Sequence, residues 1–425
     1  MENFILKGHV CYSEDQNHIR IVPDAYLVCE NGRSAGVFTE LPERYASLPV
    51  EEHGDRLIIP GLTDLHVHAP QFAFRGLGAD MELLDWLNTY TFPEESKYSD
   101  MHYAQLAYRQ FVKELRATAT TRLSVFATLH LPATEFLMQE LENSGLVSYV
   151  GKVNMDRNSP EYLCEKDAAT ALENTERWIC ETKSAFAHTK PILTPRFIPS
   201  CSDALLRGLG ELADKYGLPV QSHLSENLGE IAWVRELCPQ AAFYGDAYDR
   251  FGLFGGAHPC IMAHCVHSCE EEIERMRKNG VFVAHSPMSN ANLASGVAPV
   301  SKYLARGLNV GIASDVAGGE TLDLFRVMAD ALRDSKLRWR LLDQEVKPLT
   351  FEQVFYMATL GGGRFFGKVG SFEPGYEFDA VVLDDIPLCH PQPLSLHDRL
   401  ERCIYLSNGH QVYAKYVAGR KVEIY

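Results

Sequence analysis

The feature that most constrains the fold is a regular alternation through the middle of the chain. Short apolar segments that suit buried strands are followed by loops and then by helical stretches. The helical stretches 204–217 and 269–280, for example, each end near a glycine that can cap a helix. Eight apolar segments can be counted: 57–68, 120–130, 146–156, 190–199, 218–226, 259–265, 281–287 and 308–315.

Eight strands that alternate with helices predict an α/β protein built as a (β/α)8 TIM-type barrel. A chain of 425 residues is long enough for such a barrel and a smaller appendage. Both ends of the chain consist of short strands separated by turns, so we expect them to meet in one small β-sandwich domain. The predicted division places the sandwich at 1–57 and 369–425 and the barrel at 58–368.

Composition restricts the partners and the compartment. A net charge of −16 disfavours binding to nucleic acid, whose phosphates repel a negative surface, and suits a small neutral substrate better. The eleven cysteines show no disulfide-like spacing. The chain has neither a signal-peptide pattern nor an apolar run of membrane-spanning length. We therefore expect a cytoplasmic protein that does not associate with membranes.

Polar side chains stand where most of the predicted strands end. In a barrel of this type the carboxyl ends of the strands form the active-site face, so these side chains are expected to converge there. They are His66, His68, His130, Asp156, Arg196, His223, His264, His285 and Asp315.

The first strand carries the most informative pair. Side chains two residues apart on a strand point to the same side, so His66 and His68 face one interior space, where a shared metal ion is the usual reason for such a pair. With His223 and Asp315 they supply four ligands of the kind zinc prefers, and water can be a fifth. Asp315 can also take a proton from that water. His264 either touches the metal or, as we favour, hydrogen-bonds to the water or the substrate.

Glu226 allows two interpretations. It lies three residues after His223, where strict alternation would turn it to the opposite face, so the strand must have ended before it. It is then either a helix-capping or surface carboxylate, or a group in the site. The segment with Trp86 and Phe92 is equally ambiguous, because it suits both a lid over the pocket and a helix packed on the barrel.

Two motifs with a catalytic or metal-binding pattern are rejected. Residues 32–36 match the GxSxG nucleophile pattern, but they follow an Asn-Gly pair between two strands, which predicts a hairpin turn. Residues 264–269, HCVHSC, lack the second ligand pair of a zinc finger, so Cys265 and Cys269 are expected to be buried apolar residues. The H-x-E and later P-C-x-x-C motifs of another zinc-dependent scaffold are absent.

Several longer motifs occur in an order that resembles the amidohydrolase superfamily and, within it, the guanine deaminases. The resemblance extends over most of the chain. HxH with a later His and Asp is shared by many amidohydrolases, whereas HAPQ, TPRF and SHLSEN together are more specific. The motifs are PGLTDLHVHAPQ, LLDWLNTYTFPEE, TPRF, QSHLSEN, MAHC, HSPMSNANLASG and SDVAGG.

The resemblance implies hydrolytic deamination of guanine to xanthine and ammonia by a zinc-activated water. It implies one zinc ion per subunit, with iron as the alternative, bound by His66, His68, His223 and Asp315. Among the implied catalytic residues, Glu226 protonates ring N3, Asp315 passes a proton to the departing amine, and His264 stays near the metal. Relatives that hold two metal ions use a lysine at the end of the fourth strand. Here Lys190 lies at the start of that strand, which argues against a second metal.

The resemblance also implies which residues bind guanine. Arg196 and Gln71 would donate to the O6 and N7 edge, and Phe197 would stack on the ring. The remaining contacts would come from His68, His223, Glu226 and Asp315. A homodimer is implied as well. The alternatives are a related amidohydrolase that deaminates a pterin or an 8-oxopurine and, less favoured, a non-catalytic assembly paralogue.

Overall fold

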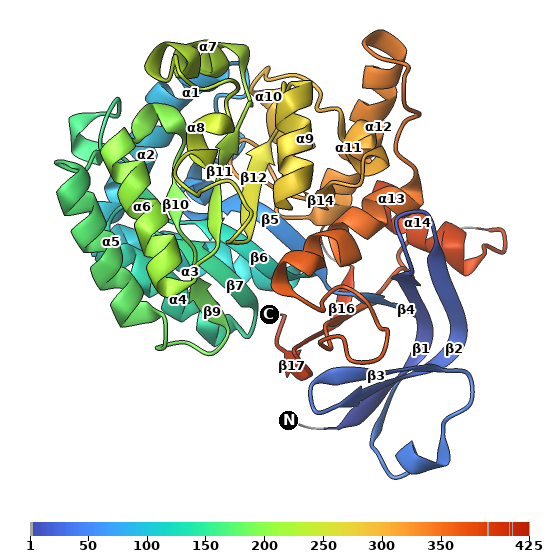
Figure 1. Cartoon of the computed structure of the whole chain (residues 1–425). Helices are drawn as coiled ribbons and strands as arrows, with labels where there is room; N and C mark the ends of the chain where they lie inside the picture. The colour runs from blue at the N-terminus through green and yellow to red at the C-terminus, as the bar shows by residue number, and fades with distance from the viewer. Residues whose placement is uncertain (1–2, 389–390, 408, 410, 425) are drawn as a thin grey trace.

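The computed structural model describes residues 3–388, 391–407, 409 and 411–424. A barrel of parallel strands surrounded by helices occupies most of the molecule, and a sheet made from both ends of the chain lies beside it (Figure 1). The predicted α/β barrel class is therefore confirmed.

The barrel strands follow one another around the barrel in chain order, as predicted. One parallel sheet contains β5, β6, β7 and β9, another contains β11 to β14, and the short strands β8 and β10 pair with each other. Backbone hydrogen bonds join the two four-stranded sheets at both sides, from Asp315 N to His66 O at 2.9 Å and from Gln221 N to Leu193 O at 2.9 Å. The strands are β5 (Leu62–His68), β6 (Thr120–Phe126), β7 (Val147–Gly151), β8 (Val153–Asn154), β9 (Thr189–Pro191), β10 (Thr194–Pro195), β11 (Val220–Leu224), β12 (Cys260–His264), β13 (Phe282–His285) and β14 (Asn309–Ile312).

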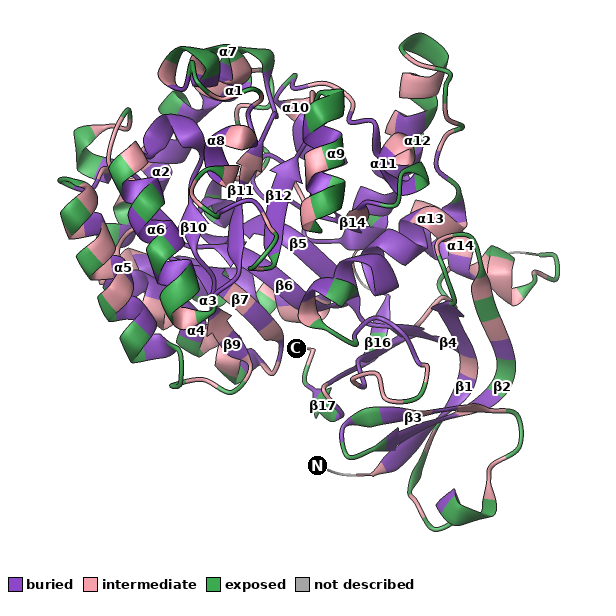
Figure 2. Ribbon diagram, viewed as in Figure 1, coloured by how far each residue is buried: buried purple, intermediate pink, exposed green. Residues whose placement is uncertain are grey.

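Helices on the outside of the barrel bury one face and expose the other (Figure 2). In α6, the Ser202 hydroxyl accepts a hydrogen bond from Leu205 N at the start, and Gly217, with φ of 63°, follows the last residue. Helix α9 ends in the same way at Gly280, with φ of 68°. The main outer helices are α3 (Met101–Ala117), α4 (Leu131–Ser144), α5 (Ala168–Thr182), α6 (Asp203–Tyr216), α7 (Leu228–Leu237), α9 (Glu270–Asn279), α11 (Val300–Ala305), α12 (Leu324–Leu341) and α13 (Phe351–Tyr356).

The two ends of the chain form one seven-stranded sheet in the order β17-β16-β15-β4-β1-β2-β3. The rings of Phe4 on β1 and Tyr416 on β16 are 5.4 Å apart, although two strands lie between theirs. In a flat sheet this separation would be about 14 Å, so the sheet folds over its own core in the manner of a sandwich. The strands are β1 (Phe4–Ser13), β2 (Ile19–Glu30), β3 (Arg33–Phe38), β4 (Val50–Pro60), β15 (Ala380–Leu383), β16 (Val412–Val417) and β17 (Arg420–Val422).

Two segments differ from the sequence interpretation. Residues 57–60 belong to β4 of the terminal sheet, where Pro60 pairs with Ala380, and not to the first barrel strand. Residues 402–406, expected in a strand, complete helix α14 (Leu396–Leu406), whose apolar face is buried against the barrel helices. The division at residues 57 and 369 stays a prediction, although β4 extends three residues past the first of these positions.

The rejected GxSxG match is a hairpin turn, as predicted. Glu30 on β2 pairs with Arg33 on β3, and the two residues between them, Asn31 and Gly32, have φ of 54° and 76°. Cys265 is buried as expected, but the expectation for Cys269 is wrong, because it is exposed just before α9. Among the described residues, none of the helices combines the length and apolar character that crossing a bilayer requires.

A buried ion pair joins the barrel to the terminal sheet. Arg122 on β6 contacts the Asp379 carboxylate twice, at 2.5 and 3.0 Å, and Glu377 once, at 2.7 Å. Asp379 is 1% exposed and lies directly before β15. The pair therefore fixes how the terminal sheet sits against the barrel.

Candidate active site

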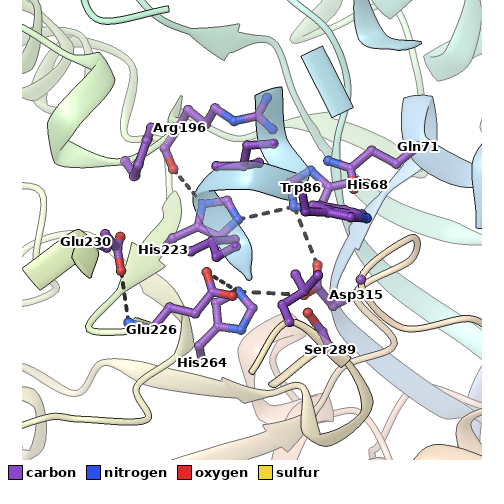
Figure 3. Close-up of a pocket in the computed structure, with 15 residues that line it drawn as sticks. His68, Gln71, Trp86, Arg196, His223, Glu226, Glu230, His264, Ser289 and Asp315 are labelled. Carbon is purple, nitrogen blue, oxygen red and sulfur yellow. Dashed lines mark hydrogen bonds and ion pairs between the residues drawn. The ribbon is translucent and has the colours of Figure 1, made fainter. Parts of the chain in front are cut away.

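A pocket with about 430 Å³ of empty space opens at the carboxyl ends of the barrel strands (Figure 3). The carboxyl ends of the strands are the face where barrels of this type carry active sites. The residues that line it are His68, Gln71, Leu83, Trp86, Leu87, Arg196, Phe197, His223, Glu226, Glu230, His264, Ser289, Leu293, Asp315 and Gly318.

Three histidines point their Nε2 atoms at one another at the base of the pocket. His68 Nε2 lies 3.1 Å from His66 Nε2 and 3.2 Å from His223 Nε2. His66 and His68 come from the same face of β5, and His223 comes from β11 across the barrel. All three rings are thus aimed at a common point.

Asp315 completes the cluster from the loop after β14. One carboxylate oxygen lies 3.1 Å from His66 Nε2 and 3.6 Å from His68 Nε2. Burial alone would raise the pKa of Asp315, but His66 and His264 beside it lower that pKa to about 2. Buried Asp64 accepts hydrogen bonds from His66 N and Ser314 N and so ties the two ligand-bearing segments together.

The donor set fits a zinc ion. His223 Nδ1 donates to the Arg196 carbonyl at 2.6 Å, so Nε2 keeps its lone pair for a metal. Burial, and then the neighbouring histidines, lower the pKa of both His68 and His223 well below the usual value, which keeps these rings neutral as metal ligands must be. Candidate ligand atoms of His66, His68 and Asp315 all lie within 4.8 Å of one another, as do those of His66, His223 and His264.

Glu226 faces the pocket because the chain turns after β11. The strand ends at Leu224, and Ser225 has a φ of 47°, which breaks the alternation. Glu226 Oε2 then lies 3.4 Å from His264 Nε2, and Oε1 accepts from the Ser295 hydroxyl at 3.3 Å. Burial, with a smaller contribution from the charge of Asp315, raises the pKa of Glu226 to about 8. The structure thus favours the site interpretation of Glu226 over the surface one.

His264 lies between the two carboxylates. Its Nε2 is 3.4 Å from Glu226 and 3.7 Å from Asp315, while Nδ1 lies 2.9 Å from the Asn290 side-chain oxygen. His264 has a φ of 71° at the end of β12, a conformation uncommon for a residue with a side chain. This backbone turn and Asn290 together hold the ring at the pocket wall.

The opposite wall carries two donor side chains. Arg196 and Gln71 both line the pocket, and both bind the buried carboxylate of Glu95. Apolar residues complete the enclosure: Phe197 lies after β10, and Trp86 lies on the short helix α1 (Leu83–Trp86). Trp86 and Phe92 are both buried in the core, and Trp86 also lines the pocket. The interpretation of this segment as a lid stays a prediction.

Four other polar residues singled out from the sequence do not line the pocket. Asp156 accepts from Ser202 N at 2.7 Å at the start of α6, and His130 precedes α4. His285 is buried on β13, where loss of solvent, and then His264, lower its pKa to about 3. Lys190 contacts the Phe186 carbonyl and lines a separate cavity, away from the histidine cluster.

Several residues near the site were not identified from the sequence, namely Asp64, Glu95, Glu230, Asn290 and Ser295. Asp64 lies on β5, Glu230 on α7, Asn290 on the short helix α10 (Pro287–Asn292) and Ser295 in the loop after it. These four are single polar residues, for which the sequence gives no local signal. Glu95 is different, because it continues a four-residue spacing through Leu83, Leu87 and Thr91, all of them buried. A carboxylate on the buried face of a helical segment was the signal that could have identified it.

The sequence profile of the Amidohydrolase family matches residues 57–422. The chain belongs to this family. It is 33% identical to the guanine deaminase of Dictyostelium discoideum over 99% of this chain and 98% of that one. It is 34% identical to the human guanine deaminase over 86% of this chain and 82% of that one. The resemblance inferred from the motifs is confirmed.

Solved structures of amidohydrolases agree with this assignment. A crystal structure of guanine deaminase from C. acetobutylicum with bound guanine superposes with a TM-score of 0.96 at 47% identity, covering 99% of this chain and 100% of that one. The E. coli guanine deaminase gives a TM-score of 0.88 at 29% identity, covering 100% of this chain and 99% of that one. The amidohydrolase family is metal-dependent, and the His and Asp cluster is a possible metal site in this member.

Proposed function

We propose that this chain is a hydrolase that deaminates guanine to xanthine and ammonia. The observation that carries the proposal is the arrangement of the pocket. A cluster of metal-ligating side chains and a buried carboxylic acid lie on one side, and a wall of hydrogen-bond donors lies on the other. The guanine deaminases at 32% to 39% identity, and the relative with guanine bound, support the same substrate.

In this proposal, His66, His68, His223 and Asp315 hold one zinc ion per subunit. The nitrogen and oxygen donor set suits zinc, and iron, which accepts the same ligands, is the alternative. When bound, the metal would lower the pKa of a water molecule toward ~7 and so supply a nucleophile at neutral pH.

The donor wall, formed by Arg196 and Gln71, would recognise the acceptor edge of guanine. Guanine presents acceptors at O6 and N7, and Arg196 has only donors to offer. The Gln71 amide supplies a further donor beside it. Phe197, which is 6% exposed, would contribute an aromatic face against the purine ring. Because Glu95 balances the charge of Arg196, this wall suits a neutral base.

Two side chains would transfer protons, and a third would hydrogen-bond to the reacting oxygen. Glu226, with its pKa raised to about 8 by burial, carries a proton at neutral pH that it can give to ring N3. Asp315, with its pKa of about 2, is ionised and can accept the proton of the attacking water. It then passes that proton to the amine as the bond from C2 to nitrogen breaks and ammonia leaves, while the C2 hydroxyl becomes a carbonyl and its proton returns to Glu226. His264, within 3.7 Å of both carboxylates, would hydrogen-bond to the oxygen that adds to C2.

The test is release of ammonia and xanthine by the purified, metal-loaded protein. Guanine is compared with adenine, a pterin, an 8-oxopurine and cytosine. Fastest turnover of guanine supports the proposal, and faster turnover of a pterin or an 8-oxopurine replaces it with that activity. A homodimer and a cytoplasmic location stay predictions, to be tested by sedimentation and by cell fractionation.

A further inference from the structure

The geometry points to Glu95 as a positioning residue that determines which hydrogen-bonding groups the pocket presents to its substrate. Glu95 is 1% exposed and lies on helix α2 (Phe92–Ser96), in the segment that also carries Trp86. It does not line the pocket itself, so it acts through the residues it binds. This inference rests on the proposed function, because it concerns how the donor wall reads a purine edge.

Glu95 fixes the guanidinium of Arg196 in one orientation. Arg196 NH1 donates to Glu95 Oε2 at 2.5 Å, and NH2 donates to Oε1 at 3.0 Å. This two-point contact holds the plane of the guanidinium and uses two of its five N–H groups. The ring of Phe92, from the same helix, lies 5.2 Å from the guanidinium carbon. The remaining N–H groups are thereby held in place for a ligand.

Glu95 also decides which end of the Gln71 amide is available. Gln71 Nε2 donates to Glu95 Oε1 at 2.9 Å, and Gln71 Oε1 accepts from Ala317 N at 3.3 Å. A carboxylate can only accept hydrogen bonds, so it admits the NH2 end of the amide and excludes the oxygen. The second N–H of Gln71 is then the group left for a ligand.

Both pocket residues therefore offer donors for the same reason. The wall suits an acceptor edge, such as O6 and N7 of guanine, and opposes an amine at the same position. If Glu95 were an amide, it could donate as well as accept. Gln71 could then turn over and offer its oxygen, at the cost of its contact with Ala317 N, and Arg196 would lose part of its two-point anchor.

The decisive variant is Glu95→Gln, which keeps the size of the side chain. We expect the KM for guanine to rise about 10- to 100-fold, the range expected when a hydrogen bond to a charged group is lost, while kcat falls by a smaller factor. Hypoxanthine has the same O6 and N7 edge without the 2-amino group, whereas adenine has an amine at position 6. As competitive inhibitors they report on recognition alone. The preference for hypoxanthine over adenine should shrink by at least about tenfold in the variant.

The matched control is Glu94→Gln. Glu94 is the adjacent buried carboxylate, but it binds Lys97 and Tyr103 and does not line the pocket. Its variant should keep the wild-type KM and the wild-type inhibitor preference. Glu95→Asp, which keeps the charge but is too short to span both partners, should weaken guanine binding while still excluding adenine.

A second experiment makes the Glu95→Gln change in an Arg196→Met protein and tests whether Glu95 acts through Arg196. There, Glu95→Gln should add much less to the KM than it does in the wild type. An unchanged inhibitor preference in a folded, metal-loaded Glu95→Gln protein would overturn the inference, as would fully additive effects with Arg196→Met. Failure of the wild-type protein to deaminate guanine would be a separate result, which would refute the proposed function.

Discussion

Replacing Glu226 by Gln tests the proton transfer on which the proposed reaction depends. The amide keeps the shape of the side chain and can still accept from the Ser295 hydroxyl, but it cannot deliver a proton. Glu226 is not part of the predicted ligand set. We therefore expect metal content near the wild-type level together with a large loss of turnover.

The magnitude follows from the protonation state. A pKa of about 8, caused by burial and by Asp315, leaves roughly ten neutral Glu226 carboxyls for each ionised one at pH 7. General acid steps contribute about 10²- to 10⁴-fold, so kcat of Glu226→Gln should fall by that factor. Because the neutral form is the donor, wild-type kcat/KM should decline as the pH rises past about 8. A cation beside Asp315 would lower the pKa of Glu226, so the decline in kcat/KM would begin at lower pH, but kcat/KM would still fall as the pH rises.

The assay is xanthine formation across pH 6 to about 10, with zinc measured in the same samples. The variant should lose the alkaline decline that the wild type shows. In metal-free protein a raised carboxyl pKa also predicts stability that is present below the unfolded-state pKa and lost as the pH rises through the folded one. The melting temperature of Glu226→Gln should lack this loss. Near-normal kcat in Glu226→Gln would refute the reasoning, and His264 would be the next candidate proton carrier.

Three further predictions concern the metal, the substrate and the domain junction. His223→Ala should lose zinc and turnover together, and full metal occupancy with activity would end the ligand assignment. Adenine should be turned over roughly 10⁴- to 10⁵-fold less efficiently than guanine, because its only amine is at C6, where it faces Arg196 and not the attacking water at C2; comparable kcat/KM values would contradict this. Arg122→Met should lower the free energy of unfolding by about 3–5 kcal/mol, because it leaves Asp379 buried without its cation. The control, Arg116→Met, breaks only the partly exposed contact with Glu423 and should cost less than ~1 kcal/mol in the same denaturant titration.

Much of the fold was predictable because barrel strands are short apolar runs with helices between them. The boundary between the terminal sheet and the barrel at Pro60 was harder to predict. Residues 57–60 are as apolar as the strand that follows, and only the long-range pairing with β15 assigns them to the terminal sheet. Helix α14 was missed because its buried residues, such as Cys403 and Ile404, are also typical of a strand.

The site was predictable to the extent that its residues stand at strand ends. His66 and His68 are recognisable from two-residue spacing, and their convergence with His223 follows from barrel geometry. Glu95 acts from a helix far along the chain from Arg196, and no local pattern reports that contact. Its burial on a helical face was the available indication. The pairing itself required the three-dimensional structure.

The measurement that tests the central claim most directly is guanine turnover by the zinc-loaded protein in H2¹⁸O. Hydrolytic attack at C2 requires that each ammonia released be matched by one xanthine that carries a single ¹⁸O atom, located at C2. Mass spectrometry of the product together with an ammonia assay gives both quantities. We predict equal amounts of ammonia and singly labelled xanthine. Absence of xanthine, or xanthine without the label, would contradict the account.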